Sequence, residues 1–142
     1  MKKYRIGYTQ GVYDMFHIGH LNLINNAKQH CDYLIVGVNS DVLVKNYKNK
    51  VPVINQEERR FIVENIKAVD KAIIVETLDK EEIYNDLKFD AIFIGDDWKD
   101  EPRWINTQKN MAQKGVDVVF LPYTSNISST ILRTKEKNSI EE

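Results

Sequence analysis

The residues that decide the fold are Gly11-Val12-Tyr13-Asp14-Met15-Phe16-His17-Ile18-Gly19-His20. They follow the apolar run Tyr4–Tyr8 and open an amphipathic segment, Ile18–His30, which predicts a strand, a tight turn and a helix. The first turn of a helix offers unpaired N–H groups and the positive end of the helix dipole to an anion. His17 and His20 stand one turn apart at that end and can add side-chain donors. The stretch therefore predicts a site for the phosphates of a nucleotide.

The rest of the chain repeats this alternation of short apolar runs and longer amphipathic segments. Strands separated by helices imply a parallel sheet with right-handed crossovers and helices on both faces. We therefore predict an α/β fold, a single Rossmann-like doubly wound domain with a five-stranded parallel sheet and a ligand crevice at the carboxyl ends of the strands. The domain is expected to span residues 1–133, followed by a polar tail at 134–142. The expected strands are Tyr4–Tyr8, Tyr33–Val38, Ala72–Val75, Ala91–Ile94 and Val116–Leu121, and the expected helices are Ile18–His30, Gln56–Val69, Lys80–Lys88 and Ile105–Lys114.

Composition limits the partners and the compartment. The 142 residues are 42% apolar and 29% charged, as in ordinary globular proteins, and the net charge of −1 argues against a nucleic-acid partner. The single cysteine, Cys31, excludes an internal disulfide and fits a reducing, cytoplasmic location. No apolar run approaches the length that spans a membrane, so membrane insertion is not expected. The first residues also lack the apolar segment of a signal peptide.

Four polar segments each follow a predicted strand: 9–20, 39–50, 95–98 and 122–130. Because the carboxyl ends of parallel strands meet at one edge of a sheet, we expect these segments to form one site. A zinc site at the two histidines would need further ligands, and His30 and Cys31 lie instead at a helix end. No metal held by the protein is therefore expected. A plain helix cap would also explain the histidine pair, but the Gly11 turn and Asp14 tighten the approach to the helix and favour the anion site.

The stretch from Gly11 to His20 resembles the G-x-F-D-x-x-H-x-G-H signature of the cytidylyltransferase-like nucleotidyltransferases. Three further motifs follow in the order of that family. Residues 59–70 are similar to its R-x-x-x-x-x-x-I-R-x-V-D helix. Gly95-Asp96-Asp97-Trp98 matches the G-D-D-W of its glycerol-3-phosphate cytidylyltransferase branch, and residues 124–130 resemble that branch's R-T-x-G-I-S-T-T. The resemblance covers the chain from Thr9 to about Arg133 and implies a nucleotidyltransferase of the HxGH type.

The resemblance implies that CTP and a small phospho-alcohol, best guessed as sn-glycerol 3-phosphate, give a CDP-alcohol and pyrophosphate. The acceptor phosphate would attack the α-phosphorus in line, so that catalysis rests on positioning and charge stabilisation. His17, His20 and Lys50 are the implied catalytic residues. Mg²⁺ is the implied cofactor, held mainly by the triphosphate and water. The family also implies a homodimer and a role in supplying a cell-surface polymer such as teichoic acid or capsule.

Matching the motifs residue by residue gives further site predictions. Lys45, Lys48 and Lys50 form a basic patch in what we interpret as a loop after the second strand. The alternative to a phosphate-binding role is an ordinary solvated loop. The family's K-x-K element assigns Lys48 to the acceptor phosphate and Lys50 to CTP, across one alignment gap. Lys80 is a weaker acceptor candidate, and a surface helix lysine is the alternative. The predicted nucleotide-binding residues are Thr9, Val12, Tyr13, Asp14, His17, His20, Lys50, Gly95, Asp97, Thr124, Ile127, Ser128, Ser129 and Thr130.

Two of these motifs also have simple structural interpretations. Gly95 and Asp97 suit a turn with a helix cap. The family resemblance implies instead that Asp97 accepts a hydrogen bond from the base or ribose. A simple N-cap would explain one hydroxyl of Ser128-Ser129-Thr130. Three hydroxyls in a row fit a second anion site better.

The chain departs from the branch at Tyr123, where an arginine is usual, and Arg103 or Arg133 are the candidate substitutes. Asn126 replaces a glycine, and Lys67 replaces an arginine, which keeps the charge but loses the bidentate geometry. The acceptor therefore stays open to another polyol phosphate, phosphocholine or phosphoethanolamine. An ATP-dependent enzyme of the same fold and a non-catalytic nucleotide-binding module are the competing interpretations.

Overall fold

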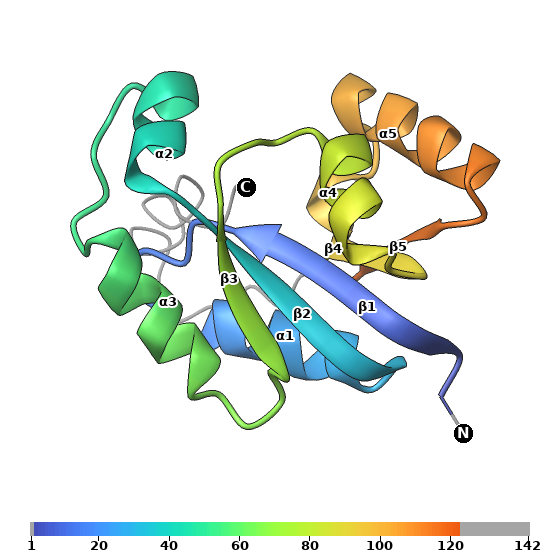
Figure 1. Cartoon of the computed structure of the whole chain (residues 1–142), viewed down its shortest axis with the longest axis horizontal. Coiled ribbons are helices and arrows are strands. Elements are labelled where there is room, and N and C mark those ends of the chain that lie inside the picture. The colour runs from blue at the N-terminus through green and yellow to red at the C-terminus, as the bar shows by residue number, and fades with distance from the viewer. Residues whose placement is uncertain (1, 123–142) are drawn as a thin grey trace.

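Parallel strands form one sheet in the order β3-β2-β1-β4-β5 (Figure 1). The structure is a computed structural model that describes residues 2–122. The sheet confirms the predicted five-stranded parallel architecture, and β1 runs past its predicted end to Gly11. The strands are β1 (Tyr4–Gly11), β2 (Cys31–Asn39), β3 (Lys71–Val75), β4 (Ala91–Gly95) and β5 (Asp117–Leu121).

The four predicted helices are present, but α3 ends at Glu64 rather than Val69 and α5 begins at Pro102 rather than Ile105. After β2 the expected loop is wrong. Ser40 caps a helix there by accepting a hydrogen bond from the N–H of Leu43, and the helix ends at Asn49, whose backbone is left-handed. Within this helix only Val44 is buried, and the lysines at its C-terminal end led us to interpret the stretch as a loop. The helices are α1 (Ile18–Lys28), α2 (Asp41–Lys48), α3 (Gln56–Glu64), α4 (Lys80–Leu87) and α5 (Pro102–Gln113), with a 3₁₀ turn, η1 (Asp96–Trp98).

Helices cover both faces of the sheet, as the doubly wound prediction requires. On one face Ile24 of α1 and Val63 of α3 pack with alternate residues of β2 such as Leu34. On the other face Ile83 of α4 and Trp104 of α5 pack against the opposite side of the sheet. No helix within residues 2–122 is long and apolar enough to cross a bilayer.

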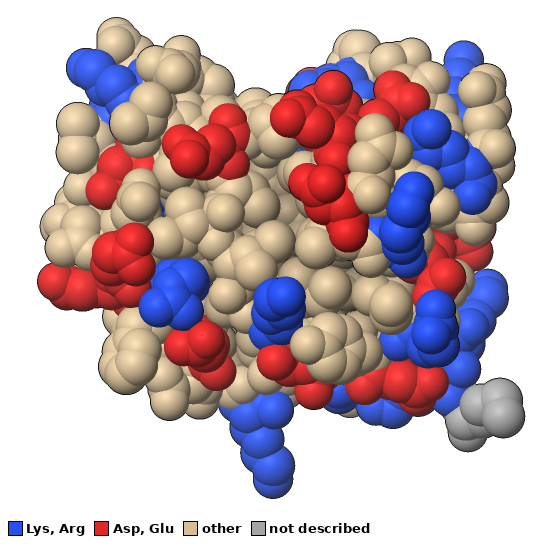
Figure 2. All heavy atoms as spheres, in the orientation of Figure 1, with Lys and Arg blue, Asp and Glu red and all other residues tan. Residues whose placement is uncertain are grey.

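The winding reverses between β1 and β4, which pair with each other in the middle of the sheet. In open α/β sheets the crevice beyond the carboxyl ends of such strands is where ligands bind. In Figure 1, α2 stands on one side of this edge and α4 and α5 on the other. Figure 2 shows the surface hollowed between these two sides, with acidic and basic side chains interspersed over the face shown.

Candidate functional site

The two predicted histidines cap α1 with one nitrogen of each ring. Nδ1 of His17 accepts a hydrogen bond from the N–H of Gly19 at 3.0 Å, and Nδ1 of His20 accepts one from the N–H of His17 at 3.1 Å. The pair forms a capping box, and the ring centroids lie 3.9 Å apart. Since a nitrogen that accepts a hydrogen bond carries no proton, a neutral ring holds its proton on Nε2. The cap and the anion site are therefore compatible, because capping fixes both rings with Nε2 as the donor atom.

The turn before α1 has a left-handed backbone at two residues. Tyr13 and Met15 have φ angles of 56° and 50°, a conformation that costs about 1–3 kcal/mol for a residue with a side chain and is held only by its surroundings. Val12 and Tyr13 are buried, and the Tyr13 ring packs edge-on to His20 with centroids 5.4 Å apart. A ligand at this turn would therefore meet their backbone rather than their side chains.

Asp14 has partners within the protein. Its carboxylate is 8% exposed and accepts hydrogen bonds from the N–H groups of Val53 and Ile54 at 2.8 and 2.9 Å. The carboxylate thus ties the turn before α1 to the segment between α2 and α3. The sequence analysis did not find this link, and a direct contact of Asp14 with the nucleotide stays a prediction.

Arg59 of α3 joins four separate segments through one buried guanidinium, 1% exposed. It donates to the carbonyl oxygens of Val12, Asn39 and Ile54 at 2.7 to 2.8 Å. It also donates to Oδ1 of Asp41 at 2.6 Å, at the start of α2. A planar guanidinium with five donors suits this task, whereas an ammonium does not. Arg59 stands in the second family motif, but the motif gave it no role.

The three lysines after β2 are carried by α2 and the residues that follow it. Lys45 and Lys48 lie in the last turn of the helix, and Lys50 follows the left-handed Asn49. Cations at a helix C-terminus also stabilise the helix dipole, so their presence alone does not prove a phosphate site. The structure does bring α2 to the carboxyl edge of the sheet, the edge shared by the other predicted site residues.

A buried chain of polar side chains connects α2 to the segment before α4, and the sequence analysis missed it. Tyr8 Oη donates to Gln10 Oε1, and Gln10 Nε2 donates to Asn39 Oδ1 and to the carbonyl oxygen of Thr77. Asn39 Nδ2 in turn donates to Tyr47 Oη of α2. The only signal in the sequence was the position of Gln10 and Asn39 at the ends of the first two strands. The chain fixes α2 and the β3–α4 connection relative to β1.

The predicted residues of β1 and β4 meet where the winding of the sheet reverses. Thr9 is buried, and its Oγ1 donates to the carbonyl oxygen of Phe93 in β4 at 2.9 Å. Gly95 ends β4 and Asp97 is exposed on η1. The turn is thus confirmed, whereas no side chain caps η1 through a hydrogen bond. The contact of Asp97 with the nucleoside stays a prediction.

The interpretation of Lys80 as a surface helix lysine is wrong. Lys80 is only 4% exposed, because its chain folds over α5 with Nζ 5.1 Å from the centroid of the Trp104 ring. Its Nζ donates to the carbonyl oxygen of Leu78 at 2.9 Å. Burying a charged side chain is costly. A buried lysine at this position is therefore a better candidate for the acceptor site than an exposed helix lysine would be.

Some of the predicted site residues lie outside the described part of the chain: Thr124, Ile127, Ser128, Ser129 and Thr130, together with Tyr123, Asn126, Arg133 and the tail at 134–142. Within residues 2–122 no group of three or more His, Cys, Asp or Glu side chains is placed to hold a metal ion.

Comparisons with known proteins agree with this geometry. The family profile described as Cytidylyltransferase-like matches residues 8–135. Glycerol-3-phosphate cytidylyltransferase of Bacillus subtilis (strain 168) is 32% identical over 88% of this chain and 92% of its own length. The Bifunctional protein HldE of Hyphomonas neptunium is 33% identical over 90% of this chain, but the match covers only 26% of that longer protein.

Solved structures share the fold. The lipopolysaccharide core biosynthesis protein from Thermoplasma volcanium GSS1 superimposes with a TM-score of 0.71 and 24% identity, covering 85% of this chain and 97% of that chain. A pantothenate synthetase from Thermus thermophilus gives a TM-score of 0.63 at 14% identity over 95% of this chain and 66% of that chain. At these identities the likeness concerns the architecture alone.

Proposed function

Because the chain belongs to the cytidylyltransferase-like family, we propose that it transfers the cytidylyl group of CTP to a small phosphorylated alcohol. The products are a CDP-alcohol and pyrophosphate. The observation that carries the proposal is the capping box of His17 and His20, which leaves Nε2 of each ring as the donor atom at the positive end of α1. The B. subtilis relative and the Gly-Asp-Asp-Trp motif favour sn-glycerol 3-phosphate as the first acceptor to test.

The proposed reaction needs no nucleophile from the protein. An oxygen of the acceptor phosphate forms a bond to the α-phosphorus of CTP, and the bond from that phosphorus to the bridging oxygen of pyrophosphate breaks. His17 and His20 donate hydrogen bonds to the phosphate oxygens that gain negative charge, and Lys50 neutralises charge on the triphosphate. Lys48 and Lys80 orient the acceptor phosphate for in-line attack.

The nucleotide is proposed to lie along the carboxyl edge of the sheet. The backbone at Val12 and Tyr13 packs against it, and Asp97 accepts a hydrogen bond from the base or ribose. Mg²⁺, when bound, neutralises charge on the triphosphate and takes its ligands mainly from phosphate oxygens and water. The remaining proposed contacts come from Thr9, Asp14, Gly95, Thr124, Ile127, Ser128, Ser129 and Thr130.

We also propose a homodimer and a role in supplying activated alcohols for a cell-surface polymer. Val51, Val53 and Phe61 are between 61% and 74% exposed around the start of α3, which is apolar surface that a second copy could cover. Another acceptor phosphate, or ATP in place of CTP, is the alternative.

A pyrophosphate-release assay with Mg²⁺ tests the proposal. CTP, ATP, UTP and GTP are each combined with glycerol 3-phosphate, other polyol phosphates, phosphocholine and phosphoethanolamine. Pyrophosphate release with CTP and a phospho-alcohol supports the proposal. Release only with ATP would show that ATP is the donor nucleotide and that the type of reaction is the one proposed. Silence across the panel contradicts an enzymatic role and favours a nucleotide-binding module.

A further inference from the structure

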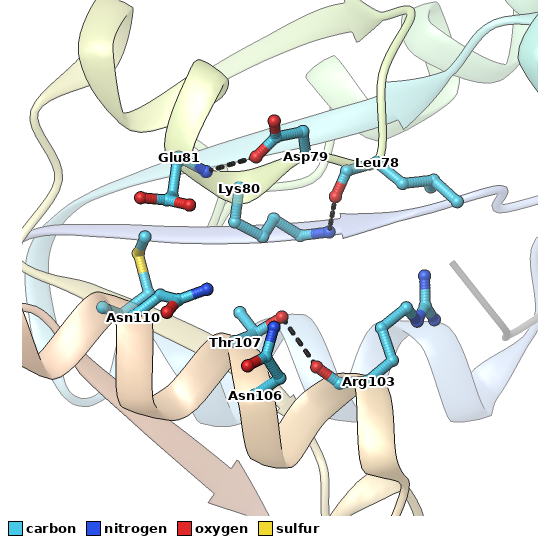
Figure 3. Close-up of a pocket in the computed structure, with 9 residues that line it drawn as sticks. Leu78, Asp79, Lys80, Glu81, Arg103, Asn106, Thr107 and Asn110 are labelled. Atoms are coloured by element: carbon cyan, nitrogen blue, oxygen red, sulfur yellow. Dashed lines mark hydrogen bonds between the residues drawn. The ribbon is translucent and has the colours of Figure 1, made fainter.

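A groove lies between the first turn of α4 and the length of α5, at one end of the candidate site (Figure 3). Its volume is about 340 Å³. Lys80 borders it from α4, and Arg103, Asn106, Thr107 and Asn110 border it from α5. In Figure 3 the α5 side chains reach up toward the chain of Lys80, so both helices present polar groups to the same space. The sequence analysis gave no function to the three uncharged polar residues of α5.

The groove lies beside the edge where the nucleotide is proposed to bind. Leu78, at its upper wall, follows Thr77, whose carbonyl oxygen accepts the hydrogen bond from Gln10 of β1. At its other end the Arg103 guanidinium lies 5.7 Å from the centroid of the Trp98 ring, at the end of the Gly-Asp-Asp-Trp motif. Both ends of the groove therefore adjoin segments that lie at the carboxyl edge of the sheet.

Charges along the groove are balanced, which decides the kind of ligand it fits. Lys80 and Arg103 bring two positive charges, and both lie near the Trp104 ring, at 5.1 and 6.0 Å from its centroid. Asp79 and Glu81 bring two negative charges. The Asp79 carboxylate caps α4, and Glu81 lies 3.7 Å from Lys114. A groove of this kind does not suit a triphosphate, whereas an uncharged, hydrogen-bonding group fits it.

Asn106, Thr107 and Asn110 supply the groups that recognise hydroxyls. They stand at i, i+1 and i+4 on α5, and each amide both donates and accepts hydrogen bonds. Thr107 Oγ1 donates to the carbonyl oxygen of Arg103, so its oxygen can still accept from a ligand. Asparagine and threonine are unfavourable in helix interiors, and solvated surface positions are better filled by glutamate or lysine. Three such residues beside one groove therefore favour a binding role over a solvated helix face.

We propose that this groove binds the hydroxylated part of the acceptor, and that the preferred acceptor is a polyol or sugar phosphate longer than glycerol 3-phosphate. This inference rests on the proposed function and narrows its acceptor class. Glycerol has three carbons, which leave most of a cavity of about 340 Å³ unfilled. Asn106 and Asn110 act as specificity-determining residues, because a site built to bind hydroxyls discriminates strongly against analogues that lack them.

The test compares Asn106→Leu and Asn110→Leu with Gln108→Leu. The control makes the same amide-to-leucine change on the same helix, at an exposed position that borders a different depression. Pyrophosphate release is measured with CTP and with glycerol 3-phosphate, a four-carbon and a five-carbon polyol phosphate, and a hexose phosphate. The wild type should use one of the longer acceptors at least about tenfold better than glycerol 3-phosphate, judged by kcat/KM.

Each groove variant should lower kcat/KM for that longer acceptor by roughly tenfold or more, mainly through KM. The KM for CTP should stay within about twofold, kcat/KM for glycerol 3-phosphate should fall less than kcat/KM for the longer acceptor, and Gln108→Leu should resemble the wild type. Equal effects on every acceptor, or a wild type that prefers glycerol 3-phosphate, would overturn the inference.

Calorimetric titration with the same phosphates separates the two levels of the proposal, since it needs no turnover. If the wild type releases no pyrophosphate but binds a longer polyol phosphate and Asn106→Leu does not, the proposed function fails and the groove assignment stands. If pyrophosphate is released while wild type and variant bind all acceptors equally, the groove assignment fails and the proposed function stands.

Discussion

The two sides of the candidate site are built differently. On the α1 side, each functional group has its position fixed by buried or partly buried hydrogen bonds: the histidines cap the helix, Asp14 holds two backbone N–H groups, and Arg59 joins four segments. On the α4–α5 side, Asn106 and Arg103 project from a helix surface into an open groove. The first side has the rigidity that charge stabilisation requires, since donors must be in place before charge develops. The second side can change its residues without disturbing the fold.

This contrast assigns chemistry to one side and acceptor recognition to the other. A family that keeps one reaction and varies its acceptor would need this division, because substitutions in the groove alter binding while the α1 side keeps its geometry. Substitutions on the α1 side should therefore affect stability or turnover, and those on the α4–α5 side should affect KM. Four predictions test or refine this contrast.

The largest effect is expected from Arg59→Ala. Removing the guanidinium leaves three buried carbonyl oxygens without their donor and Asp41 without its ion pair. The free energy of unfolding should fall by about 3 kcal/mol or more, measured by urea denaturation. Arg60→Ala is the matched control, because Arg60 pairs with the exposed Glu57 and Glu64 and should cost less than about 1 kcal/mol. Similar losses of unfolding free energy in both variants would contradict the conclusion that the Arg59 hydrogen bonds hold the α1 side together.

The next effect concerns turnover. His17→Ala and His20→Ala should each lower kcat by roughly 10²-fold or more while weakening CTP binding much less, because each ring acts on charge that develops in the transition state. His30→Ala is the control, since His30 packs against Phe93 at the start of β2 and not at the site edge. Turnover like that of the wild type in both histidine variants would contradict the catalytic assignment. Circular dichroism must show that α1 survives the loss of its cap.

Much of this fold could be predicted because it follows from local patterns. The five strands were visible as apolar runs, and their alternation with helices indicated a parallel, doubly wound sheet. Helix α2 escaped prediction because it has only eight residues and its lysines led us to interpret the stretch as a basic loop. The histidine pair was found because cap and function use residues that are adjacent in sequence.

Long-range contacts were the part that local patterns do not encode. The hydrogen bonds of Asp14 to Val53 and of Arg59 to Val12 join residues about 40 positions apart or more. Lys80 was misjudged for the same reason, because its burial depends on Trp104 of a later helix. Asn106 and Asn110 look like ordinary helix surface until α4 is placed opposite them. Sequence thus located the edge that carries the site, and tertiary packing determined how each side of it is built.

A smaller effect is expected on the basic helix α2, which stands across the carboxyl edge of the sheet from α4 and α5. Lys48→Ala should raise the KM for the acceptor by about tenfold with little change in kcat, since it removes one cation from the acceptor phosphate. Lys45→Ala, one turn earlier on the same helix, serves as the control. An effect confined to the KM for CTP would reverse the assignments of Lys48 and Lys50. An equal effect of both variants would indicate a general electrostatic contribution of α2.

The smallest effect is expected far from the site edge, where Lys28 in the last turn of α1 pairs with Asp70 before β3. Burial acts to raise the pKa of Asp70, but hydrogen bonds from Lys28 Nζ and the Leu34 N–H outweigh it and hold the pKa below its ordinary value of 3.8. A carboxylate with a lowered pKa stabilises the fold above 3.8 and loses that contribution as the pH falls through its value in the folded protein. The Tm difference between wild type and Asp70→Asn should therefore be a few degrees or less at pH 7, because both side chains are partly exposed, and should shrink below pH 3.8. A Tm difference that does not change with pH would show that the charge of Asp70 does not contribute to the stability given by the Lys28–Asp70 pair. A difference as large as that of Arg59→Ala would show that α1 is held as firmly at its far end as at the capped end, which would weaken the contrast between the buried bonding of the α1 side and the open groove.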